Sequence, residues 1–470
     1  MALTLFNTRT RKEEPFVPLV NGVVSLYACG PTVYSPVHIG NMRTYLFEDT
    51  LRRVLTYNGY RVVHAMNITD VGHMTDDADD GDDKLEVAAK KSGREPLEIA
   101  REFEALFLDD AAQLGILKPD HLLRASDAIE AQIALVKELE GKGFVYQSDE
   151  AVYFDTSKVP DYGKLTGQKL DDKRAGARDE VVLDPHKRNP SDFVLWFFLT
   201  GRHANHILHW PSPWGVGFPG WHLECSAIAR ALVGQPFDIH AGGVDLIGTH
   251  HSNEIAQSEA AYGVPLATYW MHGEHLLMNE KMSKSLGNVI TVRDLNARGF
   301  DPLSFRYLTL LTHYRQKLGF SYEALTQADR AYQHLIYALY LLMKQTQKVG
   351  TVLEAWRERF LEAINDDLGM PQALAITWEL IKERSVSPED RYATVIDFDR
   401  VFGLDLVGHV ATLAPQMSDA VRESIAEREA ARQAGDFERA DLLRDEIGSQ
   451  GYDLDDTDDG PVIRRRRAAS

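Results

Sequence analysis

Apolar runs and helical patterns alternate over the first seventy residues of the chain. The run VVSLYAC at 23–29 is apolar at nearly every position, which predicts a strand buried on both faces of a sheet. A turn at 30–32 follows, then a helical pattern from about 40 to 58 and a valine-rich strand at 61–67. Strand, loop, helix and strand in this order open a doubly wound, Rossmann-like parallel sheet, so the expected fold class is α/β.

The pattern changes twice further along the chain. From about 124 to 209, a helix near 129–142 precedes short strand-like pieces such as AVYF at 151–154, which predicts an insertion between two halves of the sheet. After about 324 the pattern becomes helical, and the segment at 331–345 is apolar nearly all round, as expected inside a bundle. The expected parts are the first half of the nucleotide-binding domain (1–123), the insertion (124–209), the second half (210–274), a loop region (275–324), a helical bundle (325–410) and a small C-terminal segment (411–470).

Composition and charge narrow the class of protein. The net charge of −19 argues against a general nucleic-acid binder, although it leaves room for a nucleic acid that docks on a local basic face. Two cysteines suit a reducing compartment, and neither a signal peptide nor a membrane-spanning run is expected, so we expect a cytoplasmic protein. The acidic segments 76–83 and 453–459 are interpreted as solvated loops. The arginines at 464–467 could contact phosphate or form a disordered tail.

Two short motifs carry the candidate chemistry. His38-Ile39-Gly40-Asn41 follows the first predicted strand, and Lys281-Met282-Ser283-Lys284-Ser285 lies past the middle of the chain. A helix N-terminus offers backbone donors to phosphate, the histidine adds a side-chain donor, and glycine permits close approach of a nucleotide. The two lysines can close on a triphosphate. Each motif alone has a plainer interpretation, as a chance string or a solvated turn, but together and in this order they resemble the signature motifs of class I aminoacyl-tRNA synthetases.

Metal-ligand residue types occur in three separate segments. Cys29 ends the first strand, Cys225 lies in GWHLEC, and His250 and Glu254 are four residues apart, so that they share one face of a helix. Two thiolates, an imidazole and a carboxylate suit tetrahedral zinc. The alternative is that these are buried core cysteines and a hydrogen-bonded core histidine, because nothing in the spacing alone joins Cys29 to Cys225.

The chain resembles the cysteinyl-tRNA synthetase family over nearly its whole length. The matching segments are CGPTVYSPVHIGN (29–41), NITD (67–70), KRNPSDFVLW (187–196), WPSPWG (210–215), PGWHLECSA (219–227), DIHAGGVDL (238–246), HHSNEIAQS (250–258), YWMHGEHL (269–276) and EKMSKSLGN (280–288). The resemblance implies one Zn²⁺ per chain on four side chains, with the substrate thiolate joining the metal: Cys29, Cys225, His250 and Glu254.

The resemblance also implies roles for other residues. It implies ATP as substrate with Mg²⁺, bound by His38, Gly40, Asn41 and Lys284, and it makes His38, Asn41, Lys281 and Lys284 the catalytic set. Trp221 would close the cysteine pocket, with Gly30, Thr69, His240 and Asp245 as further substrate contacts. The alternatives are a large core aromatic for Trp221 and turn or cap residues for Thr69, His240 and Asp245.

The family comparison extends to the partners and the domains. The resemblance implies tRNA(Cys) and L-cysteine as further substrates, a monomer, and no membrane association. By the same resemblance, 275–324 would contact the tRNA stem, 325–410 would bind the anticodon, and 411–470 would be a small tRNA-binding domain. Because an apolar pocket separates serine from cysteine poorly, selection of a soft thiolate by zinc would make an editing domain unnecessary.

Three positions depart from the family pattern. Asn41 stands where a histidine is usual, so an amide would bond ATP there. Ser252 replaces a frequent glutamate, and Val71-Gly72-His73 stands where an acidic pair is common, which leaves the role of the acidic loop 76–83 open.

Two other functions were weighed. A cysteine ligase that uses the amine of a sugar would share the catalytic half and both motifs, but the C-terminal segments, such as RQAGDFERADLLR at 432–444, favour tRNA as acceptor. A regulator that binds cysteine or a nucleotide without catalysis would be expected to lack His38, Lys284 or a zinc ligand, and all are present.

Overall fold

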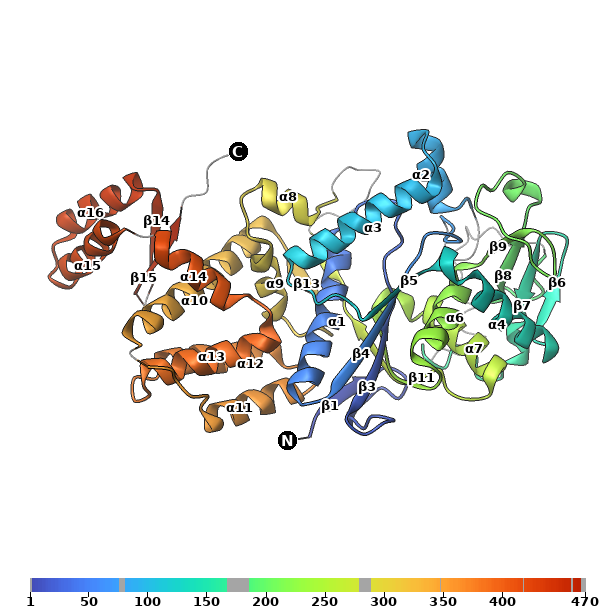
Figure 1. Ribbon diagram of the computed structural model, residues 1–470, viewed down its shortest axis with the longest axis horizontal. Coiled ribbons are helices and arrows are strands. Elements are labelled where there is room, and N and C mark those ends of the chain that lie inside the picture. Colours follow the sequence, from blue (N-terminus) through green and yellow to red (C-terminus); the bar gives the residue numbers. More distant parts are fainter. Residues whose placement is uncertain are drawn as a thin grey trace.

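A five-stranded parallel sheet forms the centre of the molecule (Figure 1). The computed structural model describes residues 2–75, 81–166, 186–278, 289–346, 348–416, 418–457 and 460–465. The strand order is β11-β10-β3-β4-β5, with bounds Ala267–Gly273 (β11), Phe237–Gly243 (β10), Val23–Ala28 (β3), Arg61–Ile68 (β4) and His121–Arg124 (β5). Every neighbouring pair is parallel, so the carboxyl ends of all five strands lie along one edge. The predicted doubly wound α/β class is confirmed.

Helices cover both faces of this sheet, as the apolar strand patterns require. The helices that contribute to the nucleotide-binding domain are α1 (Ile39–Tyr57), α2 (Lys84–Ser92), α3 (Pro96–Gln113), α6 (Trp221–Val233) and α7 (His250–Tyr262). One core cluster joins α1 and α3 to one side of β3 and β10. Another joins α6 and α7 to the opposite side, through residues such as Tyr27, Ile228 and Trp270. The sheet is therefore buried on both faces.

An antiparallel sheet lies beyond the carboxyl end of β5 in the chain. The helix α4 (Ile129–Gly141) leads into strands with the order β6-β7-β8-β9, namely Val145–Gln147 (β6), Ala151–Phe154 (β7), Phe193–Phe198 (β8) and Gly217–Pro219 (β9). Figure 1 shows this unit at the end of the molecule opposite the C-terminal helices. We expected the insertion to end at residue 209. Because β9 at Gly217–Pro219 pairs with β8, the antiparallel sheet continues beyond that residue.

The C-terminal part is mainly helical. Its helices are α8 (Val292–Ala297), α9 (Pro302–Leu310), α10 (Tyr322–Gln345), α11 (Glu354–Asn365), α12 (Met370–Lys382), α13 (Pro388–Phe402), α14 (Leu406–Gln416), α15 (Asp419–Gln433) and α16 (Phe437–Ser449). Three two-stranded sheets complete the described fold, formed by β1 (Thr4–Asn7) with β2 (Lys12–Pro15), β12 (Leu276–Met278) with β13 (Leu318–Phe320), and β14 (Tyr452–Thr457) with β15 (Gly460–Arg465).

The structure corrects the interpretation of the acidic segments as solvated loops at two places. In the first segment Asp82 is exposed in a loop, but Asp83 is buried, and its carboxylate accepts hydrogen bonds from the backbone of Leu85 and Gly72 and caps α2. Asp453 to Asp456 belong to β14, which pairs with β15 in register Asp453↔Arg464. Residues 76–80 and 466–470 lie outside the described ranges.

A buried ion pair connects α1 to the C-terminal helices. The Asp49 carboxylate accepts from Arg306 at 2.5 Å and from Arg53 at 2.7 Å, and its other oxygen accepts from the Leu117 backbone at 2.8 Å. Arg306, which is completely buried, also donates to the carbonyl of Phe402 at the end of α13. One carboxylate therefore joins the helix of the first motif to the helical bundle.

The charge on Asp49 should stabilise this junction. Burial alone would raise the pKa of Asp49, but Arg306, Arg53 and the Leu117 amide together hold it below the ordinary value. Asp49→Asn leaves a buried guanidinium uncompensated and should lower the free energy of unfolding by about 3–5 kcal/mol. Chemical denaturation at pH 7 measures this loss.

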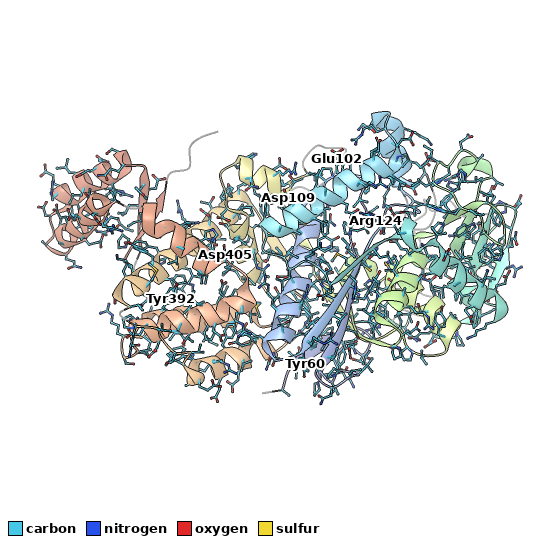
Figure 2. All side chains as sticks on the ribbon, in the orientation of Figure 1. Tyr60, Glu102, Asp109, Arg124, Tyr392 and Asp405 are labelled. Atoms are coloured by element: carbon cyan, nitrogen blue, oxygen red, sulfur yellow. The ribbon has the colours of Figure 1, made fainter. Side chains whose placement is uncertain are left out.

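The pH dependence gives a second check. Because the folded pKa lies below the unfolded one, the contribution of Asp49 is present above about pH 4 and is lost as the pH falls through the folded pKa. The difference between wild type and Asp49→Asn should therefore shrink in acid. Glu102, on α3 (Figure 2), forms an exposed ion pair with Arg94. The substitution Glu102→Gln is the matched control and should change the free energy of unfolding little. Equal effects of the two substitutions would contradict the assignment.

Candidate active site and metal centre

The first motif lies where the sheet topology predicts a ligand site. β3 ends at Ala28, the chain turns through Gly30, and α1 begins at Ile39 with His38 as its N-cap. The His38 Nδ1 accepts a hydrogen bond from the Asn41 backbone at 3.1 Å, which orders the first helical turn. This end of α1 therefore presents backbone donors at the carboxyl edge of the parallel sheet.

A cleft of about 330 Å³ opens in front of this helix end. Of the predicted site residues, those that line it are Cys29, Gly30, His38, Asn41, Thr69, Trp221, Cys225, Asp245 and His250. Gly40 lies in the first turn of α1, and Glu254 lies behind the cleft wall in contact with His250. Lys281 and Lys284 lie outside the described residues.

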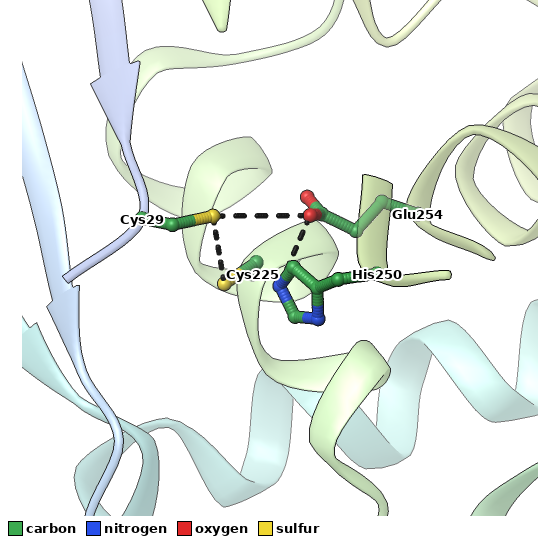
Figure 3. A group of neighbouring side chains, drawn as sticks. All are labelled: Cys29, Cys225, His250 and Glu254. Atoms are coloured by element: carbon green, nitrogen blue, oxygen red, sulfur yellow. Dashed lines mark hydrogen bonds and ion pairs between the residues drawn. The ribbon is translucent and has the colours of Figure 1, made fainter. Parts of the chain in front are cut away.

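Four donor groups from three elements meet at the floor of the cleft (Figure 3). Cys29 follows β3, Cys225 lies on α6, and His250 and Glu254 lie one turn apart on α7. The two sulfur atoms are 3.7 Å apart, Cys29 Sγ is 3.9 Å from Glu254 Oε1, and His250 Nε2 is 3.1 Å from the same oxygen. The predicted set is thus brought together in space.

These distances fit a small tetrahedral metal ion. Two sulfur ligands at about 2.3 Å and a tetrahedral angle would be separated by about 3.8 Å, which is close to the observed sulfur–sulfur distance. All four side chains are buried, and Cys29, the most exposed of them, is only 8% exposed. Burial raises the pKa of Cys225 to about 12 and lowers that of His250 to about 3, so both groups are neutral in the protein alone. A divalent cation would reverse the penalty on the thiolates.

A second set of donors lies directly behind the first. His240 and His251 join Cys29 and Glu254 within the same short range. His240 Nε2 is 2.8 Å from Glu254 Oε2, and His251 Nδ1 is 2.8 Å from His272 Nε2. Because Cys225 and His250 line the cleft and the two other histidines do not, the first set is the one that a substrate can reach.

His240 therefore does not occupy the expected position. The resemblance implied that it would contact the substrate, but it is fully buried outside the cleft lining and stacks on Trp270 with a centroid distance of 4.4 Å. Its position beside Glu254 makes it a support for the carboxylate rather than a wall of the cleft.

An aromatic stack forms one wall of the cleft. The Trp221 ring lies 3.9 Å from the His73 ring in a nearly parallel arrangement and 4.3 Å from the His250 ring. Thr32 Oγ1 lies 2.7 Å from His73 Nδ1 and orients that imidazole. The indole is thus held beside the donor cluster by its contacts with both imidazole rings.

A buried carboxylate that the sequence analysis did not single out lies in the same cleft. Glu224 Oε1 accepts from Thr69 and, at 3.0 Å, from Asn67, whereas Oε2 has no hydrogen-bond partner among the described residues. Asn67 Oδ1 accepts in turn from the Gly30 backbone at 2.8 Å. A Cβ atom on Gly30 would lie 1.7 Å from the Asn67 carbonyl oxygen, so this close approach requires glycine.

Little in the sequence pointed to a role for Glu224. A carboxylate in the first turn of a helix is ordinary, since it complements the helix dipole. Its position next to Cys225 was the one available signal. His73 and His251 were noted as neighbours of motif residues, but their contacts depend on the tertiary arrangement.

The fold and the site define a class I aminoacyl-tRNA synthetase. Residues 15–330 match the family described as tRNA synthetases class I (C) catalytic domain, which contains both halves of the parallel sheet and the insertion. Two relatives match at greater length: cysteine–tRNA ligase 1 of Burkholderia lata is 44% identical over 98% of this chain and 96% of its own. Cysteine–tRNA ligase of Thermus thermophilus is 39% identical over 99% of this chain and 100% of its own. The chain belongs to the cysteine–tRNA ligases.

Solved structures support the same fold at lower identity. Mycobacterium tuberculosis methionyl-tRNA synthetase in complex with methionyl-adenylate superposes with a TM-score of 0.54 at 16% identity, covering 83% of this chain and 91% of that one. Within the described ranges, every helix is too short or too polar to cross a membrane. Because the cysteine–tRNA ligases match across the C-terminal helices too, membership extends beyond the catalytic half that an aminosugar ligase would share.

The donor cluster yields a prediction about metal content. Glu254→Gln replaces an anionic oxygen ligand by a neutral amide of the same shape, and Cys225→Ser removes a sulfur ligand. Each substitution should therefore lower the bound zinc well below one equivalent per chain. Elemental analysis after gel filtration measures the ratio.

Glu259→Gln is the matched control for this experiment. Glu259 lies on the same helix but pairs with Arg9 and Lys164, away from the cluster, so its variant should keep its metal. Unchanged zinc in both cluster variants would refute the ligand set.

Proposed function

We propose that this protein joins L-cysteine to the 3′ end of tRNA(Cys) in two steps driven by ATP. A carboxylate oxygen of cysteine attacks the α-phosphorus of ATP and pyrophosphate leaves. The terminal ribose hydroxyl of the tRNA then attacks the activated carbonyl carbon and AMP leaves. The observation that carries the proposal is the thiol–imidazole–carboxylate cluster on the floor of a cleft that opens at the N-terminus of α1.

Zinc is the proposed ion in the cluster. Cys29, Cys225, His250 and Glu254 would hold it, which the 3.7 Å sulfur–sulfur distance supports. When bound, zinc supplies a soft Lewis acid that favours a thiolate over the hydroxyl of serine. His240 would orient Glu254 through their 2.8 Å contact.

The remaining cleft residues would position cysteine. Trp221, which contacts His73 and His250 and lines the cleft, gives an aromatic wall that excludes water and limits the size of the side chain. The free Oε2 of Glu224 suits the α-ammonium group, because a buried carboxylate oxygen gains most from a charged donor. Thr69 and Asn67 hold the other oxygen and thereby fix the carboxylate.

ATP would occupy the outer part of the cleft. The first turn of α1 is suited to bind the phosphates, through its backbone at Gly40 and the side chains of His38 and Asn41. Asp245, which is exposed and also lines the cleft, is suited to bind the nucleoside. Lys281 and Lys284, with Mg²⁺, would neutralise the charge that develops as pyrophosphate leaves. His38 can donate to the phosphate from its ring.

Glu224→Gln tests the proposed contact with the ammonium group. The substitution keeps the shape and the bonds to Thr69 but removes the charge, so KM for cysteine should rise about tenfold or more. KM for ATP should stay near the wild-type value. Steady-state pyrophosphate exchange measures both constants, and an unchanged KM for cysteine would exclude the role.

The overall function is tested by aminoacylation. Zinc-loaded protein with ATP, labelled cysteine and unfractionated tRNA should give acid-precipitable label, and labelled serine should give almost none. In Lys284→Ala the pre-steady-state burst of adenylate should slow strongly while cysteine binding persists, because the lysine acts on the leaving pyrophosphate.

The alternative acceptor gives a distinct result. Absence of label on tRNA, with pyrophosphate released when an aminosugar is added, would contradict the tRNA ligase and support a cysteine–aminosugar ligase. An unaltered burst in Lys284→Ala would refute the role of that lysine.

A further inference from the structure

A second cavity, on the other side of the sheet from the donor cluster, combines apolar walls with a few buried polar side chains. It measures about 210 Å³ and lies between α1, α3 and β4, with the loop 116–119 at its side. Its apolar walls include Met66, Phe107 and Ala111. A dry cavity of about 150 Å³ can already hold a benzene ring, so this one has room for a substituted ring.

Three buried polar side chains line this cavity, and two of them, Glu48 and His64, have no side-chain hydrogen bond among the described residues. Glu48, on α1, is 1% exposed, and His64, on β4, is 3% exposed. Neither carboxylate oxygen of Glu48 and neither ring nitrogen of His64 has a hydrogen-bond partner among the described residues. Buried polar groups are ordinarily satisfied, so these four atoms around one cavity are suited to bind a polar ligand.

The charges around Glu48 decide the chemistry of that occupant. Asp49, the adjacent carboxylate, is already neutralised by Arg306 and Arg53, whereas burial is the single cause acting on Glu48 and raises its pKa well above the ordinary value. Lys118 lines the cavity but its side chain is exposed at the surface. The carboxyl group therefore lacks a cation that the described residues could supply.

We propose that this cavity binds a small aromatic cation, an aryl amidine or arylmethylamine, with its N–H groups on Glu48 and its ring between Met66 and Phe107. Two oxygens on one carboxylate match the two parallel N–H groups of an amidine. The neutral imidazole of His64 offers a further donor or acceptor to the same polar end. The exposed residues Ala112, Leu117 and Lys118 mark the side from which a ligand enters.

The site is separate from the proposed cysteine and ATP pockets, but it shares one wall with them. Tyr45 lines both the cleft and this cavity, and Glu48 lies one helical turn from the cleft residue Thr44. An occupant would thus touch the helix that begins at His38 without entering the cleft. Binding there requires no step of the aminoacylation reaction, so its test is independent of it.

Benzamidine is the probe for the experiment, with the full-length protein and titration calorimetry as the readout. Benzamidine should bind saturably with one site, and its density should appear beside Glu48 in a soaked crystal. Glu48→Gln keeps the shape of the side chain but removes the charge, and should weaken binding about tenfold or more. Ala111→Leu fills the cavity and should abolish binding.

Controls separate the site from non-specific attraction to an acidic protein. Glu98→Gln, an exposed position on the same helix as Ala111, should bind benzamidine like the wild type. Benzyl alcohol, which has the ring but no cation, should bind far more weakly. If Ala111→Leu does not fold by circular dichroism, Ala112→Phe at the exposed entrance replaces it.

Three results would overturn the proposal. They are the absence of saturable binding to the wild type, equal binding to Glu48→Gln and wild type, and benzyl alcohol binding as tightly as benzamidine. Ordered water alone in the soaked crystal would show that solvent satisfies the four polar atoms, and would likewise exclude the ligand site.

Discussion

The central position of β3 in the parallel sheet is the constraint on which the site depends. β3 pairs with β10 on one side and β4 on the other, with Ala28 opposite both Ala241 and Met66. Because the three strands run in the same direction, Cys29, Asn67 and the start of the loop to α7 meet at one edge. The helices α6 and α7 then bring Cys225, His250 and Glu254 against that edge from one face. The donor cluster is thus a consequence of topology.

Helix α1 connects the different parts of the molecule along its length. Its first turn carries the His38–Asn41 motif, its third turn places Glu48 at the far cavity, and Asp49 pairs with Arg306, which bonds the end of α13. A rigid helix of 19 residues thus touches the cleft, the second cavity and the helical bundle. A buried charge takes part in the contact between the C-terminal helices and the catalytic domain, and it is sensitive to substitution because both Asp49 and Arg306 are buried.

The sequence predicted those features that local patterns encode. Periodicity predicted strands at 23–29 and 61–67, a helix from about 40 to 58 and a shared face of His250 and Glu254. The structure has each of them, with the strands at Val23–Ala28 and Arg61–Ile68 and the helix at Ile39–Tyr57. Spacing could not join Cys29 to Cys225, which are 196 residues apart and meet through crossover connections. The position of His240 was missed for the same reason, since its burial depends on packing against Trp270. The aspartates of β14 hid this strand, because aspartate is rare in strands; here Asp453 stands opposite Arg464 on the adjacent strand β15.

The central claim is that the substrate sulfur binds the metal of the four-residue cluster, and a spectroscopic titration tests it most directly. Cobalt(II) in place of zinc gives a thiolate-to-metal absorption band whose intensity follows the number of sulfur ligands. Addition of cysteine should strengthen this band, because a third thiolate joins those of Cys29 and Cys225, and serine should leave it unchanged. A band that does not respond to cysteine, in protein that still forms cysteinyl-adenylate, would contradict the account.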